Sequence, residues 1–132
     1  MLSTLHTMDA PKTIQRIASV FDLNEENFLR ARLADSLKAV ISQRLVQRCD
    51  TRERTAVFEI MRKTMAIEDC IKDPAKTETI RDLIASGRAQ YGMQTFDQHL
   101  MKLFKAGKID MDTAKAASTS GADFEQGVQF IQ

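Results

Sequence analysis

The longest regular pattern of apolar residues in this sequence begins shortly after Asn24. Its apolar positions recur every three or four residues and are Leu29, Leu33, Leu37, Val40 and Ile41. This spacing is typical of one face of an α-helix. Asn24 suits an N-cap, and Glu25 and Glu26 suit the positive end of the helix dipole. We therefore predict a helix from residue 24 to about residue 43, with the charged residues between the leucines, Arg30 included, mostly in water.

After residue 43 the pattern changes to that of two short strands. Residues 44–49 form one run, residues 55–61 form another, and the polar residues 50–54 separate them. In the second run, one face holds Val57, Glu59 and Met61, and the other holds Ala56, Phe58 and Ile60. Two runs of this kind around a polar link predict an antiparallel hairpin.

The stretch before the long helix predicts another helix, preceded by a candidate strand. Residues 2–7 place two leucines among small hydroxyl residues and are compatible with a short strand. Asp9 suits an N-cap, and Pro11 fits the first turn, where its missing N–H is not needed. The apolar face expected for this helix consists of Ile14, Ile17, Ala18 and Phe21.

Helix-start signals also follow the hairpin. They are found at Thr64, at the pair Asp73-Pro74, at Thr95 and at Asp110. Thr95 with Gln98 three residues later matches a capping box. A last helix is expected from the apolar positions Phe124, Val128 and Ile131. The sequence thus predicts a mostly α fold with a small β component, a helical bundle plus an antiparallel hairpin, with residues 1–132 as a single unit.

Composition narrows the class of protein. Hydrophobic residues at 43% and charged residues at 28% of 132 residues describe an ordinary soluble domain with a core. Cys49 and Cys70 are too few for a disulfide framework and lack a metal-binding spacing, so free thiols in the cytosol are expected. No apolar run is long enough to cross a bilayer, and we expect no membrane insertion.

The predicted hairpin carries an excess of positive charge. Between residues 38 and 63 the basic residues are Lys38, Arg44, Arg48, Arg52, Arg54, Arg62 and Lys63, against Asp50, Glu53 and Glu59. Arginines of this kind protect exposed strand edges from pairing with other chains. They also fit an alternative function, in which the chain is a free-standing helical adaptor that binds a protein or nucleic acid through its hairpin.

The two histidines have different sequence contexts. His99 lies beside the apolar face of a predicted helix, and we expect it to pack or to lie on the surface rather than to catalyse. His6 lies between small hydroxyl residues at the end of the candidate strand and before a capped helix. That is where α/β proteins place loops that contact ligands, so His6 is the better site candidate. None of the five glycines lies in a phosphate-binding pattern.

Several motifs resemble one family of ATPases. Leu-His-Thr-Met-Asp-Ala at residues 5–10 and Thr-Ile-Gln-Arg-Ile at residues 13–17 resemble the histidine box and following helix of the type II secretion and type IV pilus ATPases. Residues 33–45 are similar to the pilus retraction members, PilT-like and PilU-like. Gly-Met-Gln-Thr-Phe-Asp-Gln at residues 92–98 is similar to their C-terminal signature. The order and spacing of these motifs agree across nearly the whole sequence.

In that family the Walker A and Walker B segments, which hold the nucleotide, precede the histidine box, and neither is present in this sequence. The resemblance therefore implies the C-terminal part of a pilus retraction ATPase. Residues 1–61 would be the tail of a RecA-like α/β ATPase domain, with the histidine box, the long helix and the hairpin. Residues 62–132 would be the C-terminal helical portion.

The resemblance also implies cofactors, partners and location for the parent motor. These are ATP and Mg, a hexamer of identical subunits, pilus platform proteins at the inner membrane, and a cytoplasmic position peripheral to that membrane. This segment would supply subunit contacts and transmit force. Without Walker segments it is expected to bind no cofactor and to hydrolyse no ATP alone, and no nucleic acid partner is expected.

Site residues follow from the same resemblance. His6, Thr7, Asp9 and Arg16 would form the nucleotide-sensing histidine box, with His6 near the γ-phosphate. Ala66, Ile67 and Glu68 lie where the retraction ATPases carry an Ala-Ile-Arg motif needed for pulling. Here Glu68 replaces the arginine, and Met8 replaces a polar residue of the box.

Overall fold

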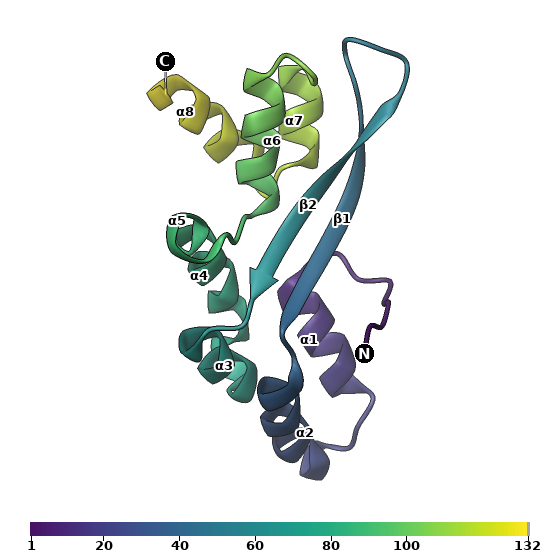
Figure 1. Cartoon of the computed structure of the whole chain (residues 1–132), viewed down its shortest axis with the longest axis vertical. Helices are drawn as coiled ribbons and strands as arrows, with labels where there is room; N and C mark the ends of the chain where they lie inside the picture. The colour runs from purple at the N-terminus through teal and green to yellow at the C-terminus, as the bar shows by residue number, and fades with distance from the viewer. Residues whose placement is uncertain (132) are drawn as a thin grey trace. The chain divides into compact units, whose positions relative to one another are not determined.

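The computed structural model describes residues 1–131, which form a series of helices and one β-hairpin (Figure 1). The elements in chain order are α1 Ala10–Ser19, α2 Leu23–Ser36, β1 Ala39–Gln47, β2 Arg54–Arg62, α3 Met65–Lys72, the 3-10 helix η1 Pro74–Thr79, α4 Ile80–Ser86, α5 Arg88–Tyr91, α6 Phe96–Lys105, α7 Met111–Ala117 and α8 Gly121–Ile131. The strands β1 and β2 form a two-stranded sheet. The predicted fold class, mostly α with a small hairpin, is confirmed.

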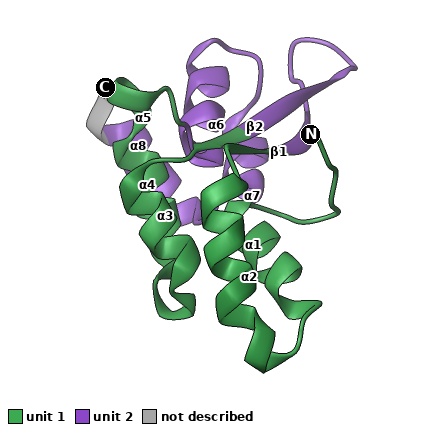
Figure 2. Ribbon diagram, turned by 60° about the horizontal axis from the view of Figure 1, so that its bottom comes forward, with its two compact units in different colours: residues 1–42, 59–93 green, residues 43–58, 94–132 purple. Residues whose placement is uncertain are grey.

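Contacts divide the chain into two compact units (Figure 2). Unit 1 contains residues 1–42 and 59–93, and unit 2 contains residues 43–58 and 94–132. Residues 1–132 are predicted to form a single unit, whereas each of the two compact units of the structure has its own hydrophobic core. The assignment of residues 1–61 to the tail of a RecA-like domain stays a prediction.

The core of unit 1 is built from apolar residues that α1, α2, β2, α3 and α4 contribute. Its buried members are Ala10, Ile14, Ala34, Met61, Ile67, Cys70, Ile71, Ile80, Ile84 and Met93. Two predicted caps set the helices around it. The Asp9 carboxylate accepts from the backbone N–H of Lys12, and the Thr64 hydroxyl accepts from that of Ile67. These contacts satisfy N–H groups that have no partner within the helix.

The long helix predicted to reach residue 43 ends at Ser36 instead. Leu37 is extended, and Val40 and Ile41 belong to β1. These β-branched residues suit a strand, and pairing with β2 satisfies their backbone groups. The helix also begins one residue before Asn24, with Asp22 at the N-cap position and no side-chain hydrogen bond there. The apolar positions predicted to form one helical face therefore belong to two elements, since Leu29 and Leu33 lie in α2 and Val40 and Ile41 lie in β1.

Arg30, predicted to lie in water, is buried with only 4% of its surface exposed. Its Nε lies 2.9 Å from Oε1 of Glu26, and its Nη1 donates to the Ile71 carbonyl and to the Thr77 hydroxyl, each at 3.1 Å. Thr77 is itself fully buried. Arg30 thus joins α2 to the end of α3 and to η1, and its charge is balanced by Glu26 on the same helix.

The candidate strand over residues 2–7 does not form, and the segment is an irregular chain with exposed Leu2 and Leu5. A strand is stable only when a neighbour pairs with its backbone N–H and C=O groups. Among the described residues the hairpin is the only sheet, and it does not extend to this segment. No helix among these residues is long and apolar enough to cross a membrane.

Unit 2 packs α6, α7 and α8 with the tip half of the hairpin. The predicted capping box is present, because Thr95 accepts from the Gln98 backbone and the Gln98 side chain accepts from the Thr95 N–H. Asp110 caps α7 through the Thr113 N–H, and this contact holds the pKa of its carboxyl below the usual value. The buried members of the core are Val46, Val57, Phe96, Leu100, Leu103, Ile109, Ala114, Phe124 and Val128. Phe124 and Val128 confirm the predicted face of the last helix, and the side chain of Ile131 lies outside the described ones.

Replacing Arg30 by methionine tests its role as a buried link. The variant Arg30→Met leaves the Ile71 carbonyl and the Thr77 hydroxyl without this donor and Glu26 without its cation. We expect the free energy of unfolding to fall by about 2–4 kcal/mol, measured by urea denaturation with circular dichroism. Arg32→Met on the exposed face of α2 is the control and should change stability by at most about 0.5 kcal/mol. Equal losses in both variants would contradict the assignment.

Candidate functional site

Two of the predicted nucleotide-sensing residues hold the start of α1. Thr7 is half-buried, and its Oγ1 lies 2.6 Å from Oγ1 of Thr13. The Thr13 hydroxyl donates to the Asp9 carbonyl at 2.9 Å, so the Thr7 hydroxyl is the donor to Thr13. Through this chain of hydrogen bonds, the residue after His6 is fixed to the first turn of the helix.

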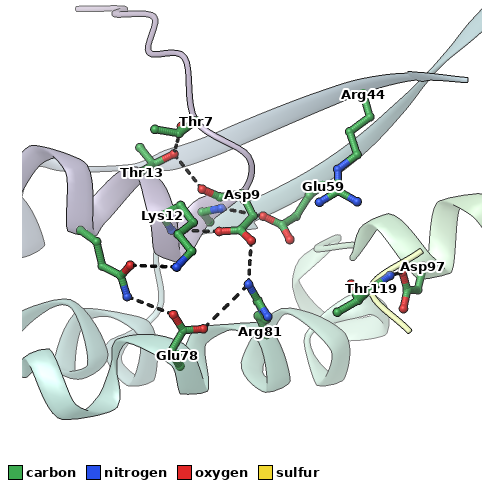
Figure 3. A network of polar contacts seen from close by, with 12 residues as sticks. Thr7, Asp9, Lys12, Thr13, Arg44, Glu59, Glu78, Arg81, Asp97 and Thr119 are labelled. Carbon is green, nitrogen blue, oxygen red and sulfur yellow. Dashed lines mark hydrogen bonds and ion pairs between the residues drawn. The ribbon is translucent and has the colours of Figure 1, made fainter. Parts of the chain in front are cut away.

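Asp9 is the centre of this arrangement and is only 6% exposed. Its Oδ1 accepts from the backbone N–H of Lys12 at 2.9 Å, and its Oδ2 accepts from Nη2 of Arg81 at 2.8 Å (Figure 3). The carboxylate therefore caps α1 and pairs with a cation from α4.

A second buried carboxylate, which the sequence analysis did not single out, approaches the same helix start. Glu59 of β2 is 4% exposed, and its Oε1 accepts from the Ala10 N–H at 2.8 Å. The N–H groups of the first turn and the positive end of the helix dipole both attract negative charge. One signal for Glu59 was present in the sequence, because it lies between Val57 and Met61 on the buried face of the strand.

We call Thr7, Asp9, Thr13, Glu59 and Arg81 the helix-start cluster. Outside it, a more exposed set of polar contacts extends along α1 and η1. Glu78 lies 3.8 Å from Arg81 and accepts from the Gln15 side chain at 3.0 Å. His6 and Arg16 are exposed and are not part of the cluster. The structure thus brings together two of the four predicted histidine-box residues, Thr7 and Asp9, and adds three residues that were not predicted as site residues, Thr13, Glu59 and Arg81.

The role that these contacts support for the helix-start cluster is structural. Its carboxylates accept from backbone N–H groups and a guanidinium, which fixes the helix start. In residues 1–131 no group of three or more His, Cys, Asp or Glu side chains is arranged to hold a metal ion. His6 and Arg16, the other two predicted nucleotide-sensing residues, are exposed.

The second predicted motif, residues 66–68, lies in the first turn of α3. Ile67 is fully buried and anchors the helix, whereas Ala66 is exposed. Glu68 is half-buried and lies 3.4 Å from Nζ of Lys72 and 4.0 Å from Nζ of Lys63. Lys63 also donates to the carbonyls of Ala34 and Asp35 at the end of α2, at 3.1 and 2.7 Å.

His99 has a packing role, as the sequence predicts. Its Nδ1 accepts from the Phe58 N–H at 2.9 Å, and its ring stacks on the Phe58 ring with centroids 6.1 Å apart. Burial, and after it the nearby Lys102, lower the pKa of His99, because both disfavour the charged ring. An Nδ1 that accepts a hydrogen bond is unprotonated, so the proton of the neutral ring is on Nε2.

Substitution of Glu59 tests whether its carboxylate holds the helix start. Glu59→Leu leaves the Ala10 N–H without its acceptor, and we expect hydrogen exchange of that amide, measured by NMR, to accelerate at least about tenfold. Glu59→Gln keeps a side-chain oxygen and should cause a smaller change. Glu78→Gln, on the exposed side of Arg81, is the matched control. Unchanged exchange in Glu59→Leu would show that another group satisfies this N–H.

The lowered pKa of His99 predicts a dependence of stability on pH. Because the folded ring binds its proton more weakly than the unfolded one, stability is complete above the ordinary pKa of about 6.5 and falls as the pH decreases below it. Urea denaturation at pH 5 and pH 7.5 should show this difference, and His99→Gln should reduce it. An NMR titration giving His99 a pKa at or above 6.5 would contradict the prediction.

The whole chain matches one protein family. Residues 1–132 match the family model described as "Type II/IV secretion system protein". The chain is 38% identical over 115 residues to a "Twitching motility protein" of Neisseria gonorrhoeae, covering 87% of this chain and 30% of that protein. It is 37% identical over 115 residues to the "Type IV pilus retractation ATPase PilT" of Pseudomonas aeruginosa, covering 87% of this chain and 33% of that protein.

A solved structure shows the same fold. The crystal structure of the pilus retraction motor PilT with bound ADP superposes with a TM-score of 0.77 and 32% sequence identity, over 92% of this chain and 33% of that one. The chain thus spans about a third of the length of the relatives that it matches. Their similarity confirms the resemblance to pilus retraction ATPases found in the sequence motifs. The chain belongs to the type II/IV secretion system protein family.

Proposed function

We propose that this chain is the C-terminal portion of a type IV pilus retraction ATPase, in which it supplies subunit contacts and transmits force. The observation that carries this proposal is the agreement with the ADP-bound retraction motor over 92% of the chain. The relatives named for twitching motility and pilus retraction support the same process. The parent is then a RecA-like ATPase that works as a hexamer, at the cytoplasmic side of the inner membrane, against pilus platform proteins.

In this proposal, the parent motor binds ATP and Mg, and this chain contributes the histidine-box residues that sense the nucleotide. His6 contacts the γ-phosphate side of a nucleotide held by other segments, which agrees with its exposed position. Movement of His6 then reaches Thr7 and the helix-start cluster. From there α1 carries it to β2 through Glu59 and to α4 through Arg81. Arg16, on the exposed side of α1, faces a neighbouring subunit.

The surface of residues 66–68 is the proposed site for force transmission. Ile67 fixes the turn to the core, so Ala66 and Glu68 are presented at a defined position. Glu68 replaces the arginine expected from the family, and Lys63 and Lys72 beside it leave the patch with positive charge. In this proposal, Lys63 and Lys72 supply the positive charge that the family's arginine would supply at position 68.

Direct nucleotide hydrolysis by the chain alone is not part of this proposal, because the sequence has no glycine-rich phosphate loop. The alternative of a free-standing adaptor receives little support from the hairpin. Arg44 lies over the Phe96 ring and donates to the Ala117 carbonyl. Arg48 pairs with Asp50, and Arg62 donates to the Tyr91 carbonyl. These arginines have partners within the chain.

A chimeric motor tests the proposed function. Replacing the matched 115 residues of Pseudomonas aeruginosa PilT by those of this chain should give a hexamer whose ATP turnover stays within about tenfold of the parent. In that chimera His6→Ala should lower kcat at least about tenfold, because the nucleotide is no longer sensed. Gln90→Ala, at an exposed position of α5, is the control and should have no effect.

Two outcomes would overturn the proposal. A chimera that assembles as a hexamer without measurable turnover would mean that this chain does not perform the corresponding role. ATP hydrolysis by the isolated chain, measured as phosphate release in the same assay, would contradict its dependence on other segments.

A further inference from the structure

The outer face of α2 exposes an apolar groove, and of its lining residues Leu33 also packs against the core of unit 1. The groove has a volume of about 500 Å³, and its lining includes Phe21, Glu25, Phe28, Leu29, Arg32 and Leu33. Phe28 is 67% exposed and Phe21 46% exposed. Exposed aromatic rings in one contiguous groove are typical of a surface that is covered in an assembly. The opposite face of α2 holds the buried Arg30 and Ala34, so one side of the helix is covered within the chain and the groove lies on the other.

The charges of α2 are sorted between these two faces. Glu26 pairs with Arg30 on the inner face. On the outer face, Glu25 and Arg32 make no ion pair with any residue among 1–131, and Arg32 lies over the Phe28 ring with 5.7 Å to its centroid. The two are separated by about 10 Å along the helix axis, which is too far for a direct ion pair. Residues 1–131 therefore supply neither charge with an ionic partner.

The order of the outer residues is self-complementary. Glu25 precedes Phe28 by three positions, and Arg32 follows Leu29 by three positions. If two copies of the helix lie antiparallel about a twofold axis between positions 28 and 29, each Phe28 lies opposite the other copy's Leu29. Each Glu25 then lies opposite the other copy's Arg32. The axis thus places apolar residues at the centre and opposite charges at both ends.

We propose that the outer face of α2 binds a second copy of this chain, with the two α2 helices antiparallel and Glu25 paired with Arg32 across the twofold axis. The contact is isologous, because the same face is used by both copies. It therefore differs from the head-to-tail contacts that close a ring of subunits, and it goes beyond the proposed motor function. It joins two chains, or one chain from each of two rings.

The size of the contact predicts a weak dimer. A helix of 14 residues with one covered face buries less area than the roughly 1,200 Å² of a stable interface. We expect a dissociation constant in the range of about 10 µM to 1 mM for the free chain. The burial of Phe28 supplies most of the attraction, and the two symmetry-related ion pairs fix the antiparallel register.

Charge exchange on the full chain tests both the surface and the register by sedimentation equilibrium. Because of the twofold axis, Glu25→Arg or Arg32→Glu alone places two pairs of like charges opposite each other and should raise the dissociation constant at least about tenfold. The double variant Glu25→Arg with Arg32→Glu restores both pairs and should return within about threefold of the original value. Arg88→Glu on α5 is the control for net charge, and Phe28→Ser should weaken the dimer in the same way as the single reversals.

The possible results separate the proposal from its competitors. A chain that remains monomeric at about 1 mM overturns the proposal, as does a dimer that none of the α2 variants weakens. If the single variants weaken the dimer and the double variant does not restore it, Glu25 does not pair with Arg32 of the other copy. That result overturns the antiparallel register. None of these outcomes bears on ATP turnover in the chimeric motor, so the two proposals fail independently.

Discussion

Two buried carboxylates set the position at which α1 begins, and much of unit 1 is arranged around them. Asp9 and Glu59 satisfy N–H groups of the first turn, and Arg81 balances part of their charge. Burying a carboxylate without such donors is costly, so the helix start, β2 and α4 are stable only in this mutual arrangement. The register of the hairpin also depends on the contact between Glu59 and the Ala10 N–H. A shift of one residue in β2 would turn Glu59 to the exposed face and leave the Ala10 N–H without an acceptor.

Local signals predicted where α1, α3, α6 and α7 begin, whereas contacts with residues distant in sequence determined features that were not predicted. The caps at Asp9, Thr64, Thr95 and Asp110 involve residues three or fewer positions apart, and each is present. The end of α2 was predicted seven residues too late. Residues 40 and 41 fit the helical period as well as they fit a strand, and only their pairing with β2 makes them a strand. Burial of Arg30 depends on Ile71 and Thr77, which are 41 and 47 residues away.

In the candidate site, too, residues close in sequence were predicted, and residues that approach from distant parts of the sequence were not. Resemblance to the pilus ATPases indicated the segment from His6 to Asp9, because that motif is continuous in sequence. Glu59 and Arg81 reach the same helix start from 49 and 72 residues away. The alternation of β2 placed Glu59 on a face with Val57 and Met61, which was a usable hint of a buried charge. No pattern around Arg81 indicates its partner, since an arginine on a short helix is ordinarily solvated.

The environment of Glu68 also constrains how this surface can change during evolution. Lys63 and Lys72 both approach its carboxylate, and Lys63 at the same time binds the last carbonyls of α2. A single mutation to arginine at position 68 would remove the carboxylate that Lys63 and Lys72 share and bring three cations together. Arginine at position 68 is therefore favoured by a loss of positive charge at a neighbouring lysine. Among related chains, the residues at positions 63, 68 and 72 are expected to vary together rather than one at a time.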